Sequence, residues 1–139
     1  MKKTKKDDLY DYATERDISV LNVDLPNNKS VSAMSKSGKC YIGLDPLEMN
    51  TKAEENVHLA HELGHCETGS FYNRYSPCDI RGKHEQTANR WAVKKLVPKT
   101  ELVRLLKKGF ARWELAESFE VTEDFINLAI RMYFEYGIV

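Results

Sequence analysis

The spacing of apolar residues in the first third of the chain predicts one helix followed by a small sheet. An apolar stripe with helical spacing covers residues 6–16. Three short apolar runs come next, and the pairs Asn27-Asn28 and Ser37-Gly38 between them are turn signals of the hairpin kind. The runs occupy residues 18–25, 30–34 and 40–44. A short antiparallel sheet is therefore expected.

The apolar spacing becomes helical again from Thr51 onwards. Thr51 and Glu54 form a T-x-x-E capping box, in which each side chain accepts from a backbone amide of the first turn. Pro98 cannot continue a helix and ends the second one of this region. The expected helices cover residues 51–69, 83–97, 101–108, 110–118 and 123–136. A sheet followed by helices predicts an α+β fold, in one domain over residues 1–139 whose last part, 100–139, is a helical segment.

The first helix of this region carries HLAHELGHC, which contains the motif H-E-x-x-H as His61, Glu62 and His65. Residues four apart on a helix lie one above the other, so both imidazoles can reach one zinc ion. Glu62 points to the same side but off the metal axis, where it can hold a metal-bound water and take its proton. The alternative is a surface helix without a metal. The cap and the anchoring residues Leu59 and Leu63 favour the metal site.

A catalytic zinc needs a third protein ligand and one open position. Glu85 continues the apolar stripe formed by Ala88, Ala92 and Leu96, where a bare carboxylate would be costly to bury. A metal ion would remove that cost, so Glu85 is the expected third ligand. Cys78 remains an alternative on the loop. The other candidates downstream of the motif are Cys66, Glu67, Asp79 and His84.

Four further residues are candidates for contacts with the oxyanion or the substrate. Tyr72, Arg74 and Tyr75 lie on the loop between the two ligand helices, so one of them can donate a hydrogen bond to an oxyanion. The alternative is that the loop packs its aromatic side chains against the helices. His58 lies three residues before His61 on the same face, either lining the cleft or partly buried and hydrogen-bonded.

The motif region, together with HEQTANRWAVKKLVP, resembles the ImmA/IrrE family of small zinc-dependent metallopeptidases. The family pattern is A-H-E-L-G-H followed by a second helix of the form E-x-x-A-N-x-F-A-x-x-L-L-x-P. The residues that match the second pattern or replace its members conservatively are Glu85, Ala88, Asn89, Trp91, Ala92, Leu96, Val97 and Pro98. Weaker similarity extends over most of the chain.

The resemblance implies a small zincin-like domain, in which a short sheet packs on the H-E-x-x-H helix and a second helix supplies a ligand. It implies that His61, His65 and Glu85 hold Zn²⁺ and that Glu62 is the general base. Members of the family are often encoded by phages and mobile elements, and their usual task is to cleave a cognate transcription repressor. The expected partner is therefore a helix-turn-helix repressor. A protein that binds this repressor without cutting it, a non-catalytic antirepressor, is the alternative.

The charge balance argues against direct binding of nucleic acid. Lysine plus arginine equals aspartate plus glutamate at 21 each, so no basic field attracts phosphates. The segment 113–132 has the look of a helix-turn-helix, but its second helix begins with Glu123 and Asp124, which have the wrong sign for DNA. A DNA-binding regulator is therefore the less favoured alternative. We expect this segment to form a packed helical cap over the core or a docking face for the repressor.

Neither a membrane-spanning run nor a signal-peptide core is apparent in the sequence. The three cysteines are Cys40, Cys66 and Cys78, and an odd number without a secretion signal argues against a disulfide framework. We therefore expect reduced thiols and a cytoplasmic location.

Overall fold

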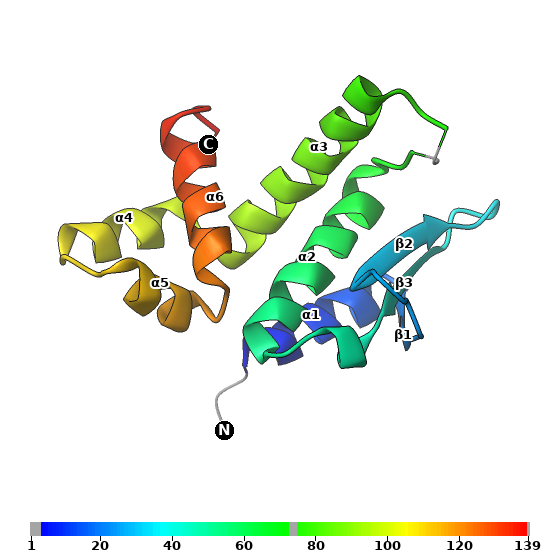
Figure 1. Cartoon of the computed structure of the whole chain (residues 1–139), viewed down its shortest axis with the longest axis horizontal. Coiled ribbons are helices and arrows are strands. Elements are labelled where there is room, and N and C mark those ends of the chain that lie inside the picture. The colour runs from blue at the N-terminus through cyan, green and yellow to red at the C-terminus, as the bar shows by residue number, and fades with distance from the viewer. Residues whose placement is uncertain (1–3, 73–74, 139) are drawn as a thin grey trace.

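The computed structural model describes residues 4–72 and 75–138 and confirms the α+β class. Figure 1 shows the sheet and α1–α3 on one side and α4–α6 on the other. The elements within the described residues are α1 (Lys5–Glu15), β1 (Ser19–Asn22), β2 (Ser30–Met34), β3 (Cys40–Leu44), the 3₁₀ turn η1 (Pro46–Glu48), α2 (Lys52–Thr68), α3 (Cys78–Leu96), α4 (Lys99–Lys107), α5 (Arg112–Phe119) and α6 (Glu123–Phe134). Helix α3 begins five residues earlier than expected.

The sheet is mixed, so the expectation of an antiparallel sheet is wrong for one of its two strand pairs. The strand order is β1-β3-β2; β2 pairs antiparallel with β3, whereas β1 pairs parallel with it. The turn at Asn27-Asn28 carries the chain to the far edge of the sheet, so β3 returns between the other two strands. The buried Asp45 holds this crossing segment, since its carboxylate accepts from the backbone N–H of Leu25 at 2.7 Å and of Leu47 at 3.0 Å.

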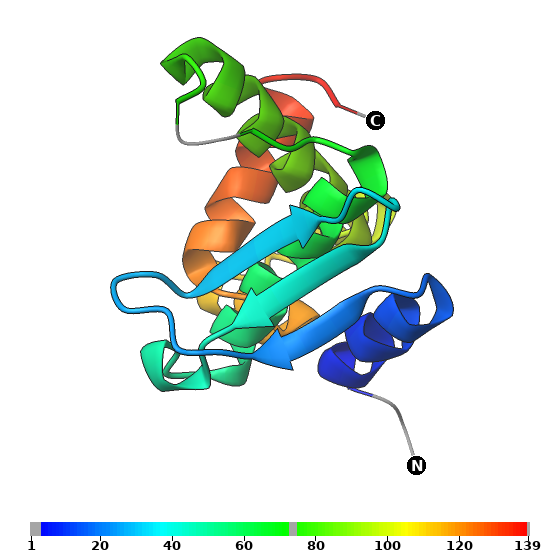
Figure 2. The same ribbon diagram turned by 90° about the vertical axis from the view of Figure 1, so that its right-hand side faces the viewer.

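Helix α2 lies against one face of the sheet and forms the centre of the molecule. Ile42 and Leu44 from β3 and Leu59 and Leu63 from α2 are almost completely buried between the two layers. In Figure 2 the three strands face the viewer, and no described helix lies in front of them. The sheet therefore has one packed face, and its edge strand β2 borders the side of α2 that carries the motif.

The cap of α2 is only half of the expected capping box. The Thr51 hydroxyl accepts from the Glu54 N–H at 3.1 Å, as expected. The Glu54 carboxylate, however, accepts from the Asn50 N–H at 2.7 Å and pairs with Lys29 at 2.6 Å. Lys29 directly precedes β2, so this ion pair joins the start of α2 to the edge strand.

The expectation of reduced thiols is wrong for two of the three cysteines. Cys40, at the start of β3, and Cys66, in the last turn of α2, form a disulfide with a Cα–Cα distance of 5.8 Å. The packing of α2 on the sheet brings these two positions together, although 26 residues separate them. Cys78 is a free, exposed thiol.

Helices α5 and α6 pack against each other and are joined by the turn around Glu120, whose backbone is left-handed at φ 58°. Asn56 of α2 donates to the carbonyl of Glu120 at 2.9 Å and connects this turn to the motif helix. Across residues 4–72 and 75–138, the helices all fall short of the length and apolar character that a membrane crossing requires.

Candidate metal centre

Helices α2 and α3 bring the side chains of His61, His65 and Glu85 together. The His61 Nε2 atom lies 2.9 Å from one Glu85 oxygen, and the His65 Nε2 atom lies 3.0 Å from the other. The two Nε2 atoms are 3.2 Å apart. One ligand atom from each residue falls within 4.8 Å of the others. Two imidazoles and a carboxylate in this arrangement match the ligand set of a catalytic zinc site.

The close contact of α2 with α3 positions Glu85. Gly64, inside the motif, faces Ala88 on α3, and a Cβ atom at residue 64 would lie 2.5 Å from the Ala88 carbonyl oxygen. The absence of a side chain at residue 64 therefore allows the two helices to approach. Ala88 is one helical turn from Glu85, so the same contact sets the distance between the carboxylate and the two histidines.

Each histidine is oriented by a hydrogen bond at its second ring nitrogen. The His61 Nδ1 atom lies 2.7 Å from the side-chain oxygen of Asn89, and the His65 Nδ1 atom contacts the backbone carbonyl of Ser70. Both partners are acceptors, so Nδ1 carries the hydrogen and donates it. Each Nε2 is then directed at the shared point, as is usual for metal-bound histidines.

Hydrogen bonds within the cluster shift the pKa values of His65 and Glu85. Burial opposes the charged form of His65, but its hydrogen bonds to Glu85 and to the Ser70 carbonyl outweigh burial and raise its pKa. Hydrogen bonds from His61 and His65 hold the pKa of Glu85 far below its usual range. The carboxylate is therefore ionised at neutral pH, and its negative charge favours a cation beside the two histidines.

Glu62 lies beside this cluster but is not part of it. Its side chain is buried, with 6% of its surface exposed. Ser30 donates to one carboxylate oxygen at 2.7 Å, and Ser32 donates to the other at 2.6 Å. Both serines belong to β2. Sequence reasoning missed them, although two serines at alternate positions of a strand are a visible sign of a polar inner face.

A cavity of about 400 Å³ opens in front of the cluster, between β2 and α2. It is lined by Asn28, Ser30, Val31, Ser32, His58, His61, Glu62, His65, Phe71, Tyr72 and Glu85. His58 is half-buried, and its Nδ1 atom lies 3.4 Å from the Ser30 hydroxyl. Burial, followed by the positive charge of Lys29, lowers the pKa of His58. His58 therefore lines the cavity and is also partly buried, so the two alternatives expected for it from the sequence occur together.

Of the two loop candidates that the structure describes, Tyr72 and Tyr75, Tyr72 lies closer to the cluster. Its hydroxyl donates to Glu85 at 2.9 Å, and its ring stacks on His84 with centroids 6.2 Å apart. Tyr75 is 79% exposed and is absent from the described residues that line the cavity. Arg74 lies outside the described residues.

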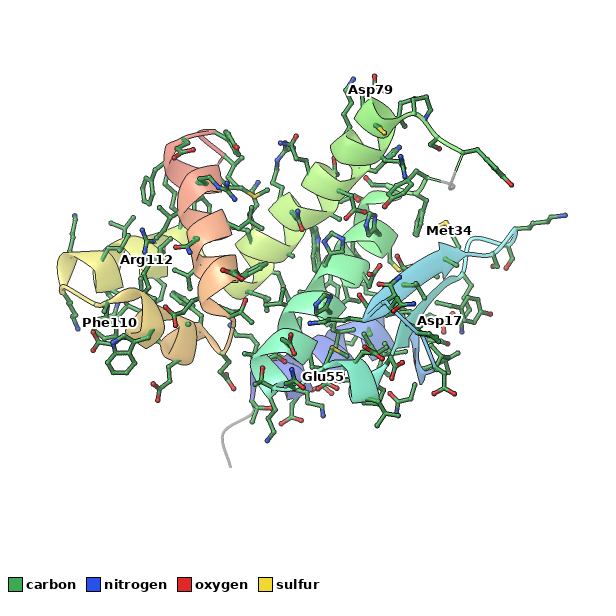
Figure 3. The ribbon with its side chains drawn as sticks, viewed as in Figure 1. Asp17, Met34, Glu55, Asp79, Phe110 and Arg112 are labelled. Carbon is green, nitrogen blue, oxygen red and sulfur yellow. A yellow bond between two sulfur atoms is a disulfide. The ribbon has the colours of Figure 1, made fainter. Side chains whose placement is uncertain are left out.

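Among the described residues, the other downstream ligand candidates do not join the cluster of His61, His65 and Glu85. Cys66 is bonded to Cys40, and the Cys78 sulfur accepts from Arg81. Figure 3 shows Asp79 at the outer tip of α3. Six residues separate Asp79 from Glu85, which is about 9 Å along a helix axis. Within the described residues, only His61, His65 and Glu85 form a cluster of this kind.

Comparison with known proteins identifies the family. The model of the Peptidase_M78 family, described as an IrrE N-terminal-like domain, matches residues 13–131. No curated protein and no solved structure matches the chain. The matched region includes the sheet, both ligand helices and most of the C-terminal helices.

Proposed function

Because the chain belongs to the Peptidase_M78 family, we propose that it is a zinc-dependent endopeptidase of the H-E-x-x-H type. The observation that carries the proposal is the convergence of His61, His65 and Glu85 on one point, with Glu62 beside them. Three protein ligands leave a coordination position open for water or substrate.

When bound, Zn²⁺ would polarise the scissile carbonyl and lower the pKa of a bound water toward neutrality. His61, His65 and Glu85 would hold the ion, with the two imidazoles oriented by Asn89 and the Ser70 carbonyl. Glu62 would take the proton of the attacking water and pass it to the leaving amine. Its buried position beside the ligands, and not among them, suits this role.

We propose that the substrate is a protein segment in extended form. The cavity runs beside β2, an edge strand of the sheet, and an edge strand can pair with an extended chain. His58 and Tyr72 line the same cavity and are the expected substrate contacts. Tyr72 is also the proposed donor to the oxyanion. Arg74 and Tyr75 are proposed as further contacts with the oxyanion or the substrate from the same loop.

The proposed substrate is a helix-turn-helix transcription repressor of a phage or mobile element, cleaved in the cytoplasm. The support is the resemblance of the two ligand helices to the ImmA/IrrE family. The test is incubation of the purified protein with the repressor encoded by a neighbouring gene. We expect cleavage by the zinc-loaded wild type, and none after chelation or in His61→Ala.

Glu62→Gln is the decisive variant in this assay, because glutamine is nearly isosteric and cannot accept the proton. The variant should retain zinc and repressor binding, and its rate of cleavage should fall by about 10²–10⁴-fold. A wild-type rate in Glu62→Gln would refute water activation by this residue. Repressor binding without cleavage by the wild type would support the non-catalytic antirepressor instead.

A further inference from the structure

Ser30 and Ser32 turn their backbone groups toward the free edge of the sheet and their side chains toward α2. The Ser35 N–H donates to the Lys39 carbonyl, and the Asp45 N–H donates to the Lys29 carbonyl. Hydrogen-bonded pairs alternate in an antiparallel ladder, so the residues between them turn their backbone N–H and C=O groups away from the partner strand. Ser30 and Ser32 are two of these intervening residues. Their backbone groups therefore face the free edge of the sheet.

The side chains of the same two serines point to α2, where they hold Glu62. Each hydroxyl donates to a different carboxylate oxygen, at 2.7 Å for Ser30 and 2.6 Å for Ser32. Two donors on two oxygens fix the rotation of the carboxylate as well as its position. Each oxygen keeps acceptor capacity for a further hydrogen bond. The orientation of Glu62 is thus tied to the position of the edge strand.

We propose that Ser30 and Ser32 are positioning residues that couple an extended substrate at the edge of β2 to the orientation of Glu62. The inference rests on the proposed endopeptidase function and deepens it. Backbone hydrogen bonds from an extended peptide to these residues hold β2 in place, and their hydroxyls then hold the carboxylate toward the attacking water. One strand therefore binds the substrate and sets the angle of the base.

A purely structural role for the serines makes a different prediction. If they only satisfy a buried carboxylate, their loss lowers the melting temperature and leaves the zinc-bound centre otherwise unchanged. The matched variants are Ser32→Ala, which removes one hydroxyl, and Ser32→Thr, which keeps it on a strand-compatible side chain. Ala33→Ser is the control, because residue 33 has the opposite orientation on the same strand.

The probe is acetohydroxamic acid, a small ligand that chelates zinc and whose hydroxyl donates to a neighbouring carboxylate. Its affinity for the zinc-loaded protein reports the orientation of Glu62 without a protein substrate. We expect Ser32→Ala to weaken binding about tenfold and the double variant Ser30→Ala/Ser32→Ala about 100-fold. Zinc content should stay at the wild-type level, and Ser32→Thr and Ala33→Ser should bind like the wild type.

The kinetics of repressor cleavage supply the second readout. The loss in Ser32→Ala should fall on kcat, with KM nearly unchanged, because the backbone contacts at the edge remain. Wild-type hydroxamate affinity and kcat in a folded, zinc-loaded Ser32→Ala would overturn the proposal, and so would failure of Ser32→Thr to restore both. Serine-dependent hydroxamate binding by a protein that cleaves no repressor would remove the endopeptidase proposal alone. A wild type that binds neither zinc nor hydroxamate would remove both.

Discussion

Gly64 and Ala88 lie so close that a Cβ atom on residue 64 would be 2.5 Å from the carbonyl oxygen of residue 88. The obstacle is backbone of α3, which cannot rotate away as a side chain can. Gly64→Ala must therefore separate α2 from α3 and move Glu85 away from the histidines. We expect zinc affinity to fall by at least about tenfold, by analogy with lost supporting contacts at metal sites, and the free energy of unfolding to fall by about 1–3 kcal/mol.

Gly82→Ala is the matched control, because residue 82 is also a helical glycine and a Cβ atom added there would meet nothing within 4 Å. Zinc affinity should not change, and the helix should gain up to about 1 kcal/mol from the removal of glycine. The measurements are zinc titration and chemical unfolding of both variants. Wild-type zinc affinity in Gly64→Ala would show that the helix contact does not set the ligand geometry.

Local signals predicted the parts of the fold that depend on neighbouring residues. The turn pairs Asn27-Asn28 and Ser37-Gly38 delimit β2 and β3. Gly69 ends α2 and Pro98 ends α3, and each of these signals acts within a few residues. The parallel pairing of β1 with β3 was not predictable in this way, because it depends on the crossing segment held by Asp45. The pairing of Cys40 with Cys66 likewise required the packing of α2 on the sheet.

The same division holds for the candidate site. His61, Glu62 and His65 share one helix turn, so their spacing alone indicates the chemistry. Glu85 was found from its place in an apolar stripe, and the structure brings it to the two histidines. Ser30 and Ser32 were missed, because their contacts with Glu62 cross from a strand to a helix about 30 residues away and local periodicity does not report such contacts.

Zinc binding should weaken steeply on acidification. The raised pKa of His65 means that the metal-free protein holds a proton at a pH where a free histidine, with a pKa of about 6.5, has released it. Zinc must displace this proton, so its apparent affinity should fall about tenfold per pH unit below that pKa. The folding stability of the metal-free protein depends on pH in the opposite direction. The stability that His65 contributes is present below pH 6.5 and is lost as the pH rises through its raised pKa.

The increase in melting temperature caused by zinc should therefore be much smaller at pH 5.5 than at pH 7.5. Thermal unfolding with and without zinc at both pH values measures it. An increase that does not depend on pH would mean that His65 is not protonated in the metal-free form, or that it does not bind the metal.

Reduction of the Cys40–Cys66 disulfide should destabilise the protein. The bond closes a loop over a sequence separation of 26 residues, for which the chain-entropy estimate is about 3.5 kcal/mol. Urea unfolding of zinc-free protein, with and without a reductant, measures the difference. Cys66→Ser should match the reduced wild type, and Cys78→Ser, at the free thiol, should retain the full effect of the reductant. Equal stability of the oxidised and reduced forms would contradict a structural role for the bond.

The C-terminal helices should add little affinity for DNA. Glu123 and Asp124 are exposed in the first turn of α6, which would be the recognition helix of a helix-turn-helix. Their charges repel phosphates, and the chain as a whole has a net charge of 0. Titration of a random duplex in low salt should show no binding. Tight binding that weakens steeply as salt rises would restore the DNA-binding alternative.

Tyr72→Phe should separate two uses of the tyrosine hydroxyl. The hydroxyl donates to Glu85 at 2.9 Å, which supports a ligand in the way that partners of metal-bound carboxylates do. The variant should therefore bind zinc about tenfold more weakly with the fold intact, since the ring and its stacking on His84 remain. If the hydroxyl turns its single O–H from Glu85 to the oxyanion during the reaction, kcat at saturating zinc should fall by about 10²–10³-fold as well. Zinc affinity and kcat measured on the same preparation distinguish the roles. If both zinc affinity and kcat stay at the wild-type values, Tyr72 only packs in the loop, and its hydroxyl is not the donor to the oxyanion.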